Sequence, residues 1–397
     1  MDKLIYMDNA ATTFVDKKVF EAMAPYLTDK CFNPSSIYDG AQDVHADLDK
    51  ARELIATTLG ASAREIYFTA CGTESDNWAI KGVAHGNSDK GKHLITTKIE
   101  HHAVLHSMAA LEKEGFEVTY LPVDENGKVS VSDVEKAIRK DTVLVSVMFA
   151  NNEIGTIEPI KEIGEICKKK GVYFHVDAVQ AYAHLPINVN DYNIDLLSAS
   201  GHKFNAMKGT GFLYIRKGIK IANFIDGGAQ ESRRRAGTEN VAGIIGMAKA
   251  TEIAHSEMKE RMEHELKIRD YIIDRVLKEI PYSKLNGDRV DRLSNNVNIG
   301  FEFIEGESML LALNDLGVCA SSGSACTSGS LDPSHVLLAI GLPHEKAHGS
   351  LRLTVSHDTT MDDAKYVCDN LPKIVERLRS MSPLYEDFVK KNGANNR

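Results

Sequence analysis

Short apolar runs alternate with amphipathic helical stretches along the first half of the chain. Runs rich in β-branched and aromatic residues, typical of buried strands, cover residues 65–69, 93–97, 117–121, 142–149, 173–176, 196–199 and 211–215. Helical patterns fall between most of them, for example at 44–59, 75–83 and 160–170. This alternation predicts an α/β fold with a mostly parallel sheet covered by helices. Ligand chemistry is then expected in loops beyond the strand ends.

A long charged and helix-prone stretch at 241–280 breaks this alternation, and Pro281 stops it. Beyond it, a smaller α+β unit is predicted from strand-like or helix-like patterns at 295–303, 306–316, 350–355 and 361–378. The N-terminal segment is expected to join this unit. The predicted division is therefore a large domain at 15–259 and a small domain made of 1–14 and 260–397. The polar tail after Pro383 is expected to be disordered.

Composition is that of an ordinary globular protein. The 397 residues are 43% hydrophobic, which is enough for a large core. A formal net charge of −9 repels polyanions, so nucleic acid is not an expected partner. No apolar run approaches the roughly 18 residues that span a bilayer, and the N-terminus lacks the apolar core of a signal peptide. A cytoplasmic protein without a membrane partner is therefore predicted.

Six cysteines are present, and none of them forms a CxxC pair. This pattern predicts free thiols rather than a disulfide scaffold or a zinc site. A free thiol is often only a small buried hydrophobe. Cys326 differs because it lies in a stretch of small and polar residues at 320–329, in which an exposed thiol could move between sites and act as a nucleophile.

Two polar residues follow apolar runs of the predicted sheet. Lys203 comes directly after the run at 196–199, where a half-buried amine with a lowered pKa could form a Schiff base. A solvated loop lysine is the alternative. Asp177 ends the run at 173–176, and its carboxylate could pair with a pyridinium nitrogen or cap the next turn.

The segment 68–77 follows another predicted strand and opens a helix. Its small residues leave backbone N–H groups accessible to a phosphate, and the helix dipole favours an anion there. Thr73 or Ser75 as an ordinary helix N-cap is the alternative, and spacing alone does not separate the two.

Ordered motifs along almost the whole chain carry a resemblance to a known family. They read YMDNAATT at 6–13, GTESDN at 72–77, EHHAV at 100–104, NNEIG at 151–155, HVDAVQ at 175–180, SGHK at 200–203, RRAGTEN at 234–240 and SGSAC at 322–326. They resemble the cysteine desulfurases of the NifS/IscS type, class V aminotransferases of fold type I that use pyridoxal phosphate (PLP). The resemblance implies a small C-terminal domain that carries a catalytic cysteine loop at about 317–333.

The resemblance also implies residue roles. Lys203 would hold PLP and move protons at the substrate Cα, His101 would stack on the ring and transfer protons, and Cys326 would take the sulfur. The remaining implied contacts are Asp177 to the ring nitrogen, Gln180 to the ring oxygen, Gly72, Thr73, Ser200 and His202 to the phosphate, Thr238 to the phosphate in the neighbouring subunit, and Asn152 and Arg352 to the substrate carboxylate. A structural ion pair is the alternative for Arg352. His102 and His106 lack an evident third ligand, so no metal is expected.

The implied reaction converts L-cysteine to L-alanine and leaves a persulfide on Cys326. A homodimer would then pass the sulfur to an acceptor, such as an iron–sulfur cluster scaffold or another thiolation pathway. Selenocysteine lyase and cysteine sulfinate desulfinase activities are alternatives on the same scaffold, and a sulfur-relay protein without turnover is an alternative of another class. The chain departs from the family pattern at Cys71, Asn205 and Met207, where local geometry and oxidation sensitivity are affected.

Overall fold

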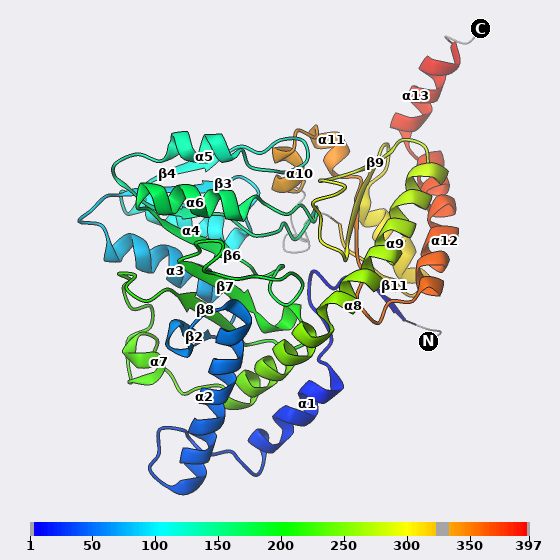
Figure 1. Cartoon of the computed structure of the whole chain (residues 1–397). Coiled ribbons are helices and arrows are strands. Elements are labelled where there is room, and N and C mark those ends of the chain that lie inside the picture. The colour runs from blue at the N-terminus through cyan, green and yellow to red at the C-terminus, as the bar shows by residue number, and fades with distance from the viewer. Residues whose placement is uncertain (1–3, 323–332, 395–397) are drawn as a thin grey trace.

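The computed structural model describes residues 4–322 and 333–394, which form two packed units of unequal size (Figure 1). The centre of the larger unit is a seven-stranded sheet with the strand order β2–β8–β7–β6–β5–β3–β4. The strands are β2 Ile66–Thr69, β3 His93–Thr97, β4 Glu117–Leu121, β5 Thr142–Ser146, β6 Tyr173–Asp177, β7 Leu196–Ser200 and β8 Gly211–Ile215. Strands β4, β3, β5, β6 and β7 run parallel, and β8 is antiparallel to both of its neighbours. The predicted mostly parallel α/β sheet is confirmed.

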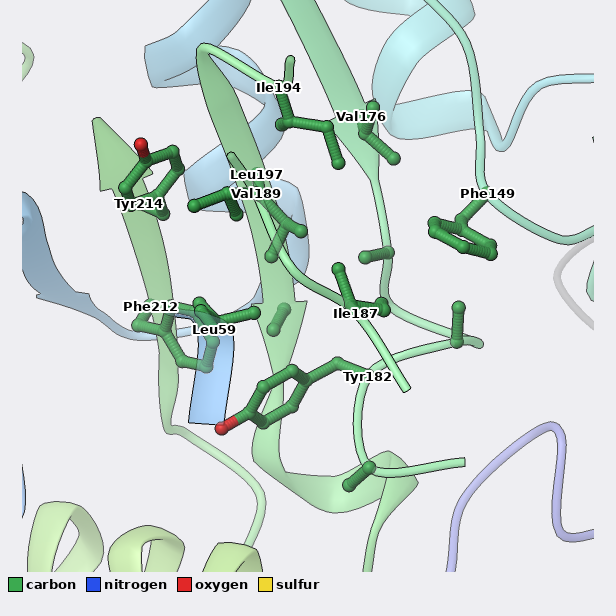
Figure 2. Close-up of a cluster of buried hydrophobic side chains, with 14 of the residues drawn as sticks. Leu59, Phe149, Val176, Tyr182, Ile187, Val189, Ile194, Leu197, Phe212 and Tyr214 are labelled. Carbon is green, nitrogen blue, oxygen red and sulfur yellow. The ribbon is translucent and has the colours of Figure 1, made fainter. Parts of the chain in front are cut away.

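Helices cover both faces of this sheet, because its strands are apolar on both sides. One face packs against α3 Gly72–Gly86 and α4 His102–Lys113. The other face contributes the cluster of Figure 2 to a core shared with the remaining helices of this unit, which include α1 Lys17–Met23, α2 Asp39–Leu59, α5 Val131–Ala137 and α6 Ile160–Lys170. Shorter elements are η1 Ala24–Leu27, η2 Ala63–Glu65, η3 Gly201–Lys203 and α7 Gln230–Arg233.

The smaller unit surrounds a three-stranded antiparallel sheet with the order β12–β10–β9. Its core also contains β1 and β11, which pair in parallel, so the N-terminal strand packs with this unit. The elements are β1 Ile5–Tyr6, β9 Ser283–Leu285, β10 Asn296–Phe301, α9 Gly306–Asp315, β11 Val318–Cys319, α10 His335–Ala339, α11 His344–Ala347, β12 Ser350–Thr354 and α12 Met361–Ser380. None of the helices within the described ranges could cross a membrane.

Helix α8, Val241–Glu279, connects the two units. Its first half packs into the core of the large unit through residues such as Met247, and its second half packs into the core of the small unit through residues such as Ile272. The predicted domain boundary at residue 259 falls inside this helix, between the two halves. The division into domains at that residue stays a prediction.

The expected disorder after Pro383 is wrong, because residues Pro383–Ala394 form helix α13. Phe388 packs on Phe303 and Tyr282, with ring centroids 4.8 and 5.1 Å apart. Tyr385 lies 5.5 Å from the Phe303 ring. These aromatic contacts hold the start of the helix on the small unit, although the tail is polar on average.

Candidate active site

A cavity of about 350 Å³ lies between the two units, at the carboxyl ends of β6 and β7. Its volume falls in the range of small-molecule sites. Every predicted site residue lines it except Thr238, which is exposed elsewhere, and Cys326, which lies outside the described residues. The predicted residues in the wall are Gly72, Thr73, His101, Asn152, Asp177, Gln180, Ser200, His202, Lys203 and Arg352.

Lys203 ends the short helix η3 that follows β7. Its Nζ donates hydrogen bonds to the backbone oxygens of Ala10, at 2.6 Å, and Ala11, at 2.9 Å. The alternative of a solvated loop lysine is therefore wrong. Gln180 donates to the same Ala10 oxygen at 3.0 Å, so the N-terminal segment of the small unit closes over the amine.

Asp177 is the last residue of β6 and is 5% exposed. Its Oδ1 accepts a hydrogen bond from the Val179 backbone N–H at 2.9 Å, so the residue caps its turn. The same side chain also lines the cavity. Capping of the turn and pairing with a pyridinium nitrogen are therefore compatible, because the turn uses only one of the two carboxylate oxygens.

The N-terminus of α3 opens into the cavity at Gly72 and Thr73. The N-cap is Cys71, whose side chain caps no backbone N–H within the described chain, so the alternative of a Thr73 or Ser75 cap is wrong. A Cβ on Gly72 would lie 2.6 Å from Val179 Cγ2, which explains a glycine at this close approach. Backbone N–H groups at such a helix start favour an anion.

Two further donors face this helix start. Ser200 Oγ is buried and has no hydrogen-bond partner among the residues that the structure describes. His202 Nδ1 lies 3.1 Å from Thr12 Oγ1, and burial together with Lys203 lowers the pKa of His202 to about 4. An unpartnered hydroxyl, a neutral imidazole and a helix N-terminus fit a phosphate, and the amine of Lys203 and the carboxylate of Asp177 fit the aldehyde and ring nitrogen of PLP.

His101 is the N-cap of α4, and its Nδ1 accepts a hydrogen bond from the Ala103 backbone N–H at 3.1 Å. Burial, followed by the charge of Lys203, lowers the pKa of His101 to about 4. The imidazole is therefore neutral near pH 7. Because Nδ1 is an acceptor, this hydrogen bond assigns the ring proton to Nε2.

Arg352 lies on β12 of the small unit, is 1% exposed and reaches the cavity wall. Its Nη2 pairs with Asp8 Oδ1 at 2.9 Å, and its Nη1 donates to the backbone oxygen of Asn152 at 3.0 Å. Its Nε is buried without a partner in the described part of the chain. The structural ion pair exists, and the guanidinium retains a donor for a further anion.

The structure brings a third histidine, His335, to His102 and His106, with the His335 and His102 ring centroids 4.7 Å apart. Sequence reasoning missed it because His335 follows more than two hundred residues later. Across residues 4–322 and 333–394, no group of three or more His, Cys, Asp or Glu side chains is arranged to hold a metal ion.

Sequence reasoning also missed Asp76 and Glu153, two buried acids in the cavity wall. Both belong to motifs that were recognised, at 72–77 and 151–155, so a charged residue inside a buried motif was the available signal. Glu153 accepts a hydrogen bond from Ser334 Oγ, and burial raises the pKa of Glu153 to about 7.

The unusual residues near Lys203 have a local explanation. Asn205 adopts a left-handed conformation with a φ of 69°, which asparagine tolerates better than most residues. Its backbone N–H donates to Thr13 Oγ1 at 2.8 Å, and its side-chain amide donates to the backbone oxygen of Phe14 at 3.0 Å. Met207 packs against the large core, and Cys71 lines the cavity beside the helix start.

Comparisons with known proteins identify sequences similar to almost the whole chain. The aminotransferase class-V family model matches residues 5–367. A "Cysteine desulfurase IscS" of Methanosarcina thermophila is 60% identical over 96% of this chain and 95% of its own length. One of Clostridium botulinum (strain Hall) is 56% identical over 98% of this chain and 99% of its own length.

Solved structures give the same result. A "NIFS-LIKE PROTEIN" superposes with a TM-score of 0.89 at 37% identity, over 95% of this chain and all of its own. A NifS-like protein from Rickettsia africae superposes with a TM-score of 0.86 at 30% identity, over 94% of this chain and all of its own.

Proposed function

The chain belongs to the aminotransferase class-V family and is a PLP-dependent cysteine desulfurase, and from this premise we propose which residues perform its reaction. It converts L-cysteine to L-alanine and holds the released sulfur on Cys326 as a persulfide. The observation that carries the proposal is one cavity with three complementary charged groups: Lys203, Asp177 and Arg352. When bound, PLP supplies an electron sink that weakens the bonds at the substrate Cα and Cβ.

The residues of the large unit hold the cofactor. Lys203 binds its aldehyde carbon, Asp177 pairs with its ring nitrogen and Gln180 bonds its ring oxygen. The phosphate binds at Gly72 and Thr73 on the α3 N-terminus, with Ser200 and His202. The unpartnered Ser200 hydroxyl and the open helix start in the described structure support this assignment.

Arg352 and Asn152 bind the substrate carboxylate. The buried guanidinium is already fixed by Asp8 and by the Asn152 backbone, so it is oriented before substrate arrives. The Lys203 amine takes the Cα proton, and the neutral His101 imidazole accepts or returns a second proton. The low pKa of His101 supports this role, because the imidazole is unprotonated at neutral pH.

The sulfur then moves to Cys326. Its thiolate attacks the substrate sulfur, so an S–S bond forms while the substrate Cβ–S bond breaks. The carbon skeleton gains a proton at Cβ and leaves as L-alanine, and the enzyme thiol becomes a persulfide. The atoms balance without an added oxidant: one thiol and L-cysteine give one persulfide and L-alanine.

A homodimer completes the site. Thr238 is exposed and lies outside the cavity of its own subunit, which supports its reaching the cofactor phosphate of a partner. Large apolar side chains are exposed on α1 and in the segments just before α1 and α2, including Phe20 at 59%, Phe14 at 61% and Ile37 at 95%. A surface of this kind favours burial in an interface.

The persulfide is passed to an acceptor protein, of which an iron–sulfur cluster scaffold is our first candidate. The resemblance to IscS-type enzymes supports this choice. A cytoplasmic location stays a prediction.

The test measures alanine and sulfide from L-cysteine and a thiol reductant, using PLP-loaded protein. Cys326→Ala should lose both products, whereas Cys319→Ala, a matched thiol seven residues earlier, should keep them. Alanine from Cys326→Ala at the native rate would contradict the persulfide step. Turnover of only selenocysteine or cysteine sulfinate would favour the alternative activities, and purified protein that never binds PLP would favour a relay protein without turnover.

A further inference from the structure

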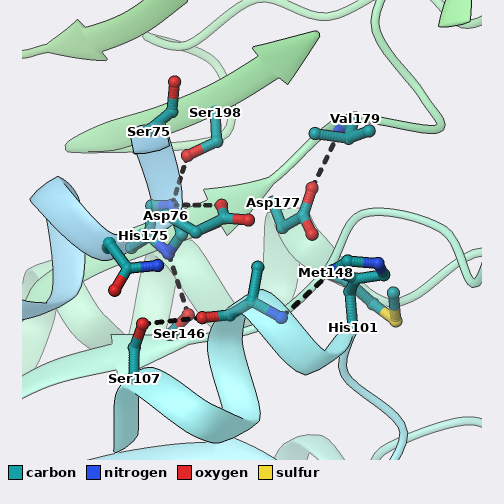
Figure 3. Close-up of polar contacts among 12 residues, drawn as sticks. Ser75, Asp76, His101, Ser107, Ser146, Met148, His175, Asp177, Val179 and Ser198 are labelled. Atoms are coloured by element: carbon teal, nitrogen blue, oxygen red, sulfur yellow. Dashed lines mark hydrogen bonds and ion pairs between the residues drawn. The ribbon is translucent and has the colours of Figure 1, made fainter. Parts of the chain in front are cut away.

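Two carboxyl groups, and not one, line the cavity at the carboxyl end of β6, a region that we call the deep end. Asp177 ends β6, and Asp76 projects from α3, which packs over the same face of the sheet. Both line the cavity, and Asp76 is 1% exposed. Figure 3 shows the carboxyl group of Asp76 pointing toward that of Asp177. The proposed mechanism uses Asp177 and gives no role to Asp76.

His175 lies behind both acids in a row fixed by strand register. Ser146 on β5 pairs with His175 on β6, and Ser198 on β7 pairs with Asp177. The His175 ring nitrogens are 2.8 Å from Ser146 Oγ and 3.0 Å from Ser198 Oγ (Figure 3). Both nitrogens therefore have hydroxyl partners. Burial lowers the pKa of His175 to about 3, so the ring is neutral.

Among the residues that the structure describes, no cation therefore lies beside Asp76. Its Oδ1 lies 3.6 Å from His175 Nε2, just beyond hydrogen-bond distance, and makes no hydrogen bond within the described residues. Asp177 and His175 from β6, Ser198 from β7 and Glu100 from the segment before α4 are the polar groups that face it. The charge of Lys203 works to lower the pKa of Asp177 and not that of Asp76. The Lys203 amine donates hydrogen bonds to the Ala10 and Ala11 carbonyls.

Two ionised carboxylates in one buried space repel each other, and burial opposes the charge of each. Burial and the charge of Asp177 raise the pKa of Asp76 well above its usual range. Burial does the same to Glu100, whose Oε1 accepts hydrogen bonds from Thr97 Oγ1 and the Met148 backbone N–H. Lys203 favours the ionised form of Asp177 alone.

We propose that Asp76 is a positioning residue that stays a neutral carboxylic acid. It fills the polar space between His175 and Asp177 without adding a second negative charge, so Asp177 is the single charged carboxylate that pairs with the protonated ring nitrogen. A protonated carboxyl both donates and accepts, so it can bond to the Ser198 hydroxyl without a counter-charge. This inference rests on the proposed function, in which Asp177 contacts the PLP ring nitrogen.

The test compares PLP binding by apo protein of the wild type, D76N and D177N. Trp78, the only tryptophan, lies on the same helix as Asp76 and reports binding through its fluorescence. Asn has the shape of a protonated Asp but cannot ionise. At pH 7 we expect D76N to bind PLP within about threefold of wild type, and D177N to bind at least about tenfold more weakly.

The pH dependence provides a second arm. A neutral Asp76 and an Asn at the same position carry the same charge, so neither side chain gains or loses a proton when PLP binds between about pH 6 and pH 8. The ratio of the wild-type and D76N dissociation constants should therefore be constant across this range. A ratio that changes with pH there would overturn the proposal, because Asp76 of the wild type would then be ionising.

Binding loss in D76N equal to that in D177N would also overturn it, because Asp76 would then carry a needed charge. If D177N binds PLP like the wild type, both this inference and the assigned ring-nitrogen contact fail. If only D76N departs from the expected PLP binding, this inference fails and the proposed function stays intact. Should D76N not fold, carboxyl NMR of aspartate-labelled holoenzyme decides: one protonated aspartate at pH 7 supports the proposal, and none overturns it.

Discussion

The deep end of the cavity, around Asp177, and the part of its wall around Arg352 and Glu153, which we call the mouth, are built in different ways. At the deep end, Ser146, His175, Asp177 and Ser198 lie on neighbouring strands of one sheet, and hydrogen-bonded register sets their spacing. At the mouth, residues of the large unit meet Arg352, from a separate core. Under the proposed roles, chemistry at the ring nitrogen would depend on secondary structure, whereas substrate recognition would depend on how the two units dock.

The two ends also differ in charge. The deep end contains the buried acids Asp76, Glu100 and Asp177, whose pKa values burial raises. The mouth contains the buried cation Arg352, which Asp8 partly neutralises. This arrangement suits the proposed roles, in which a cofactor with a cationic ring nitrogen and a substrate with an anionic carboxylate would be bound by opposite charges.

The largest effect is expected from Asp177→Asn at the deep end. Removing one partner of a buried charge pair costs about 3–5 kcal/mol, so kcat should fall roughly 100- to 5000-fold in PLP-saturated enzyme. Steady-state alanine formation measures this. Asp195→Asn is the control, because Asp195 bonds the Phe174 backbone and Arg216 away from the cavity, and its kcat should stay within about threefold. A small loss of kcat in Asp177→Asn would mean that the position of this side chain, which strand register sets, is sufficient and that its charge is not needed.

The next largest effect is expected from Arg352→Gln at the mouth. Loss of the charged contact should raise the KM for L-cysteine by roughly 10- to 150-fold, corresponding to about 1.5–3 kcal/mol. PLP affinity should hardly change, because Arg352 is not assigned to the cofactor. Asp8→Asn keeps the guanidinium and removes its ion pair, so its KM should rise less. If Arg352→Gln lost as much PLP affinity as Asp177→Asn, the deep end and the mouth would not act separately.

Glu153→Gln tests the mouth through its effect on the free energy of unfolding. The pKa of Glu153 is about 7 in the folded protein against an ordinary 4.5. Between these values the folded protein holds a proton that the unfolded chain has released, so stability from this group is greatest below pH 4.5 and declines as pH rises to 7. Gln does not titrate. The variant should therefore gain about 1–3 kcal/mol relative to the wild type between pH 5 and pH 8.

Thermal unfolding of the apo protein at both pH values measures this difference. The exposed Glu162, nine residues later, supplies a matched control, and Glu162→Gln should change the free energy of unfolding by no more than about 0.5 kcal/mol. A wild type that gained stability relative to Glu153→Gln on raising the pH would reverse the assigned sign.

The sequence predicted the deep end better than the mouth for a physical reason. Strand periodicity located β6 and β7. Asp177, which ends β6, and Lys203, which follows β7, were then site candidates. The contact of Arg352 with the Asn152 backbone and the approach of His335 to His102 depend on the docking of the two units, which no local pattern encodes. Helix α13 was missed because its aromatic contacts with Tyr282 and Phe303 join residues far apart in the sequence.

The smallest effect is expected at Asn205, which joins the Lys203 turn to the N-terminal segment of the mouth. Asn205→Gly keeps the left-handed conformation and loses the side-chain hydrogen bonds, so it should cost about 0.5–1.5 kcal/mol of unfolding free energy. Asn205→Ala should cost about 1 kcal/mol more, because a Cβ disfavours a φ of 69°. Urea unfolding of the apo protein measures the order wild type, Gly, Ala. Equal costs for Gly and Ala would show that the turn relaxes when its side chain is lost, and that the two ends are joined less rigidly than the hydrogen bonds indicate.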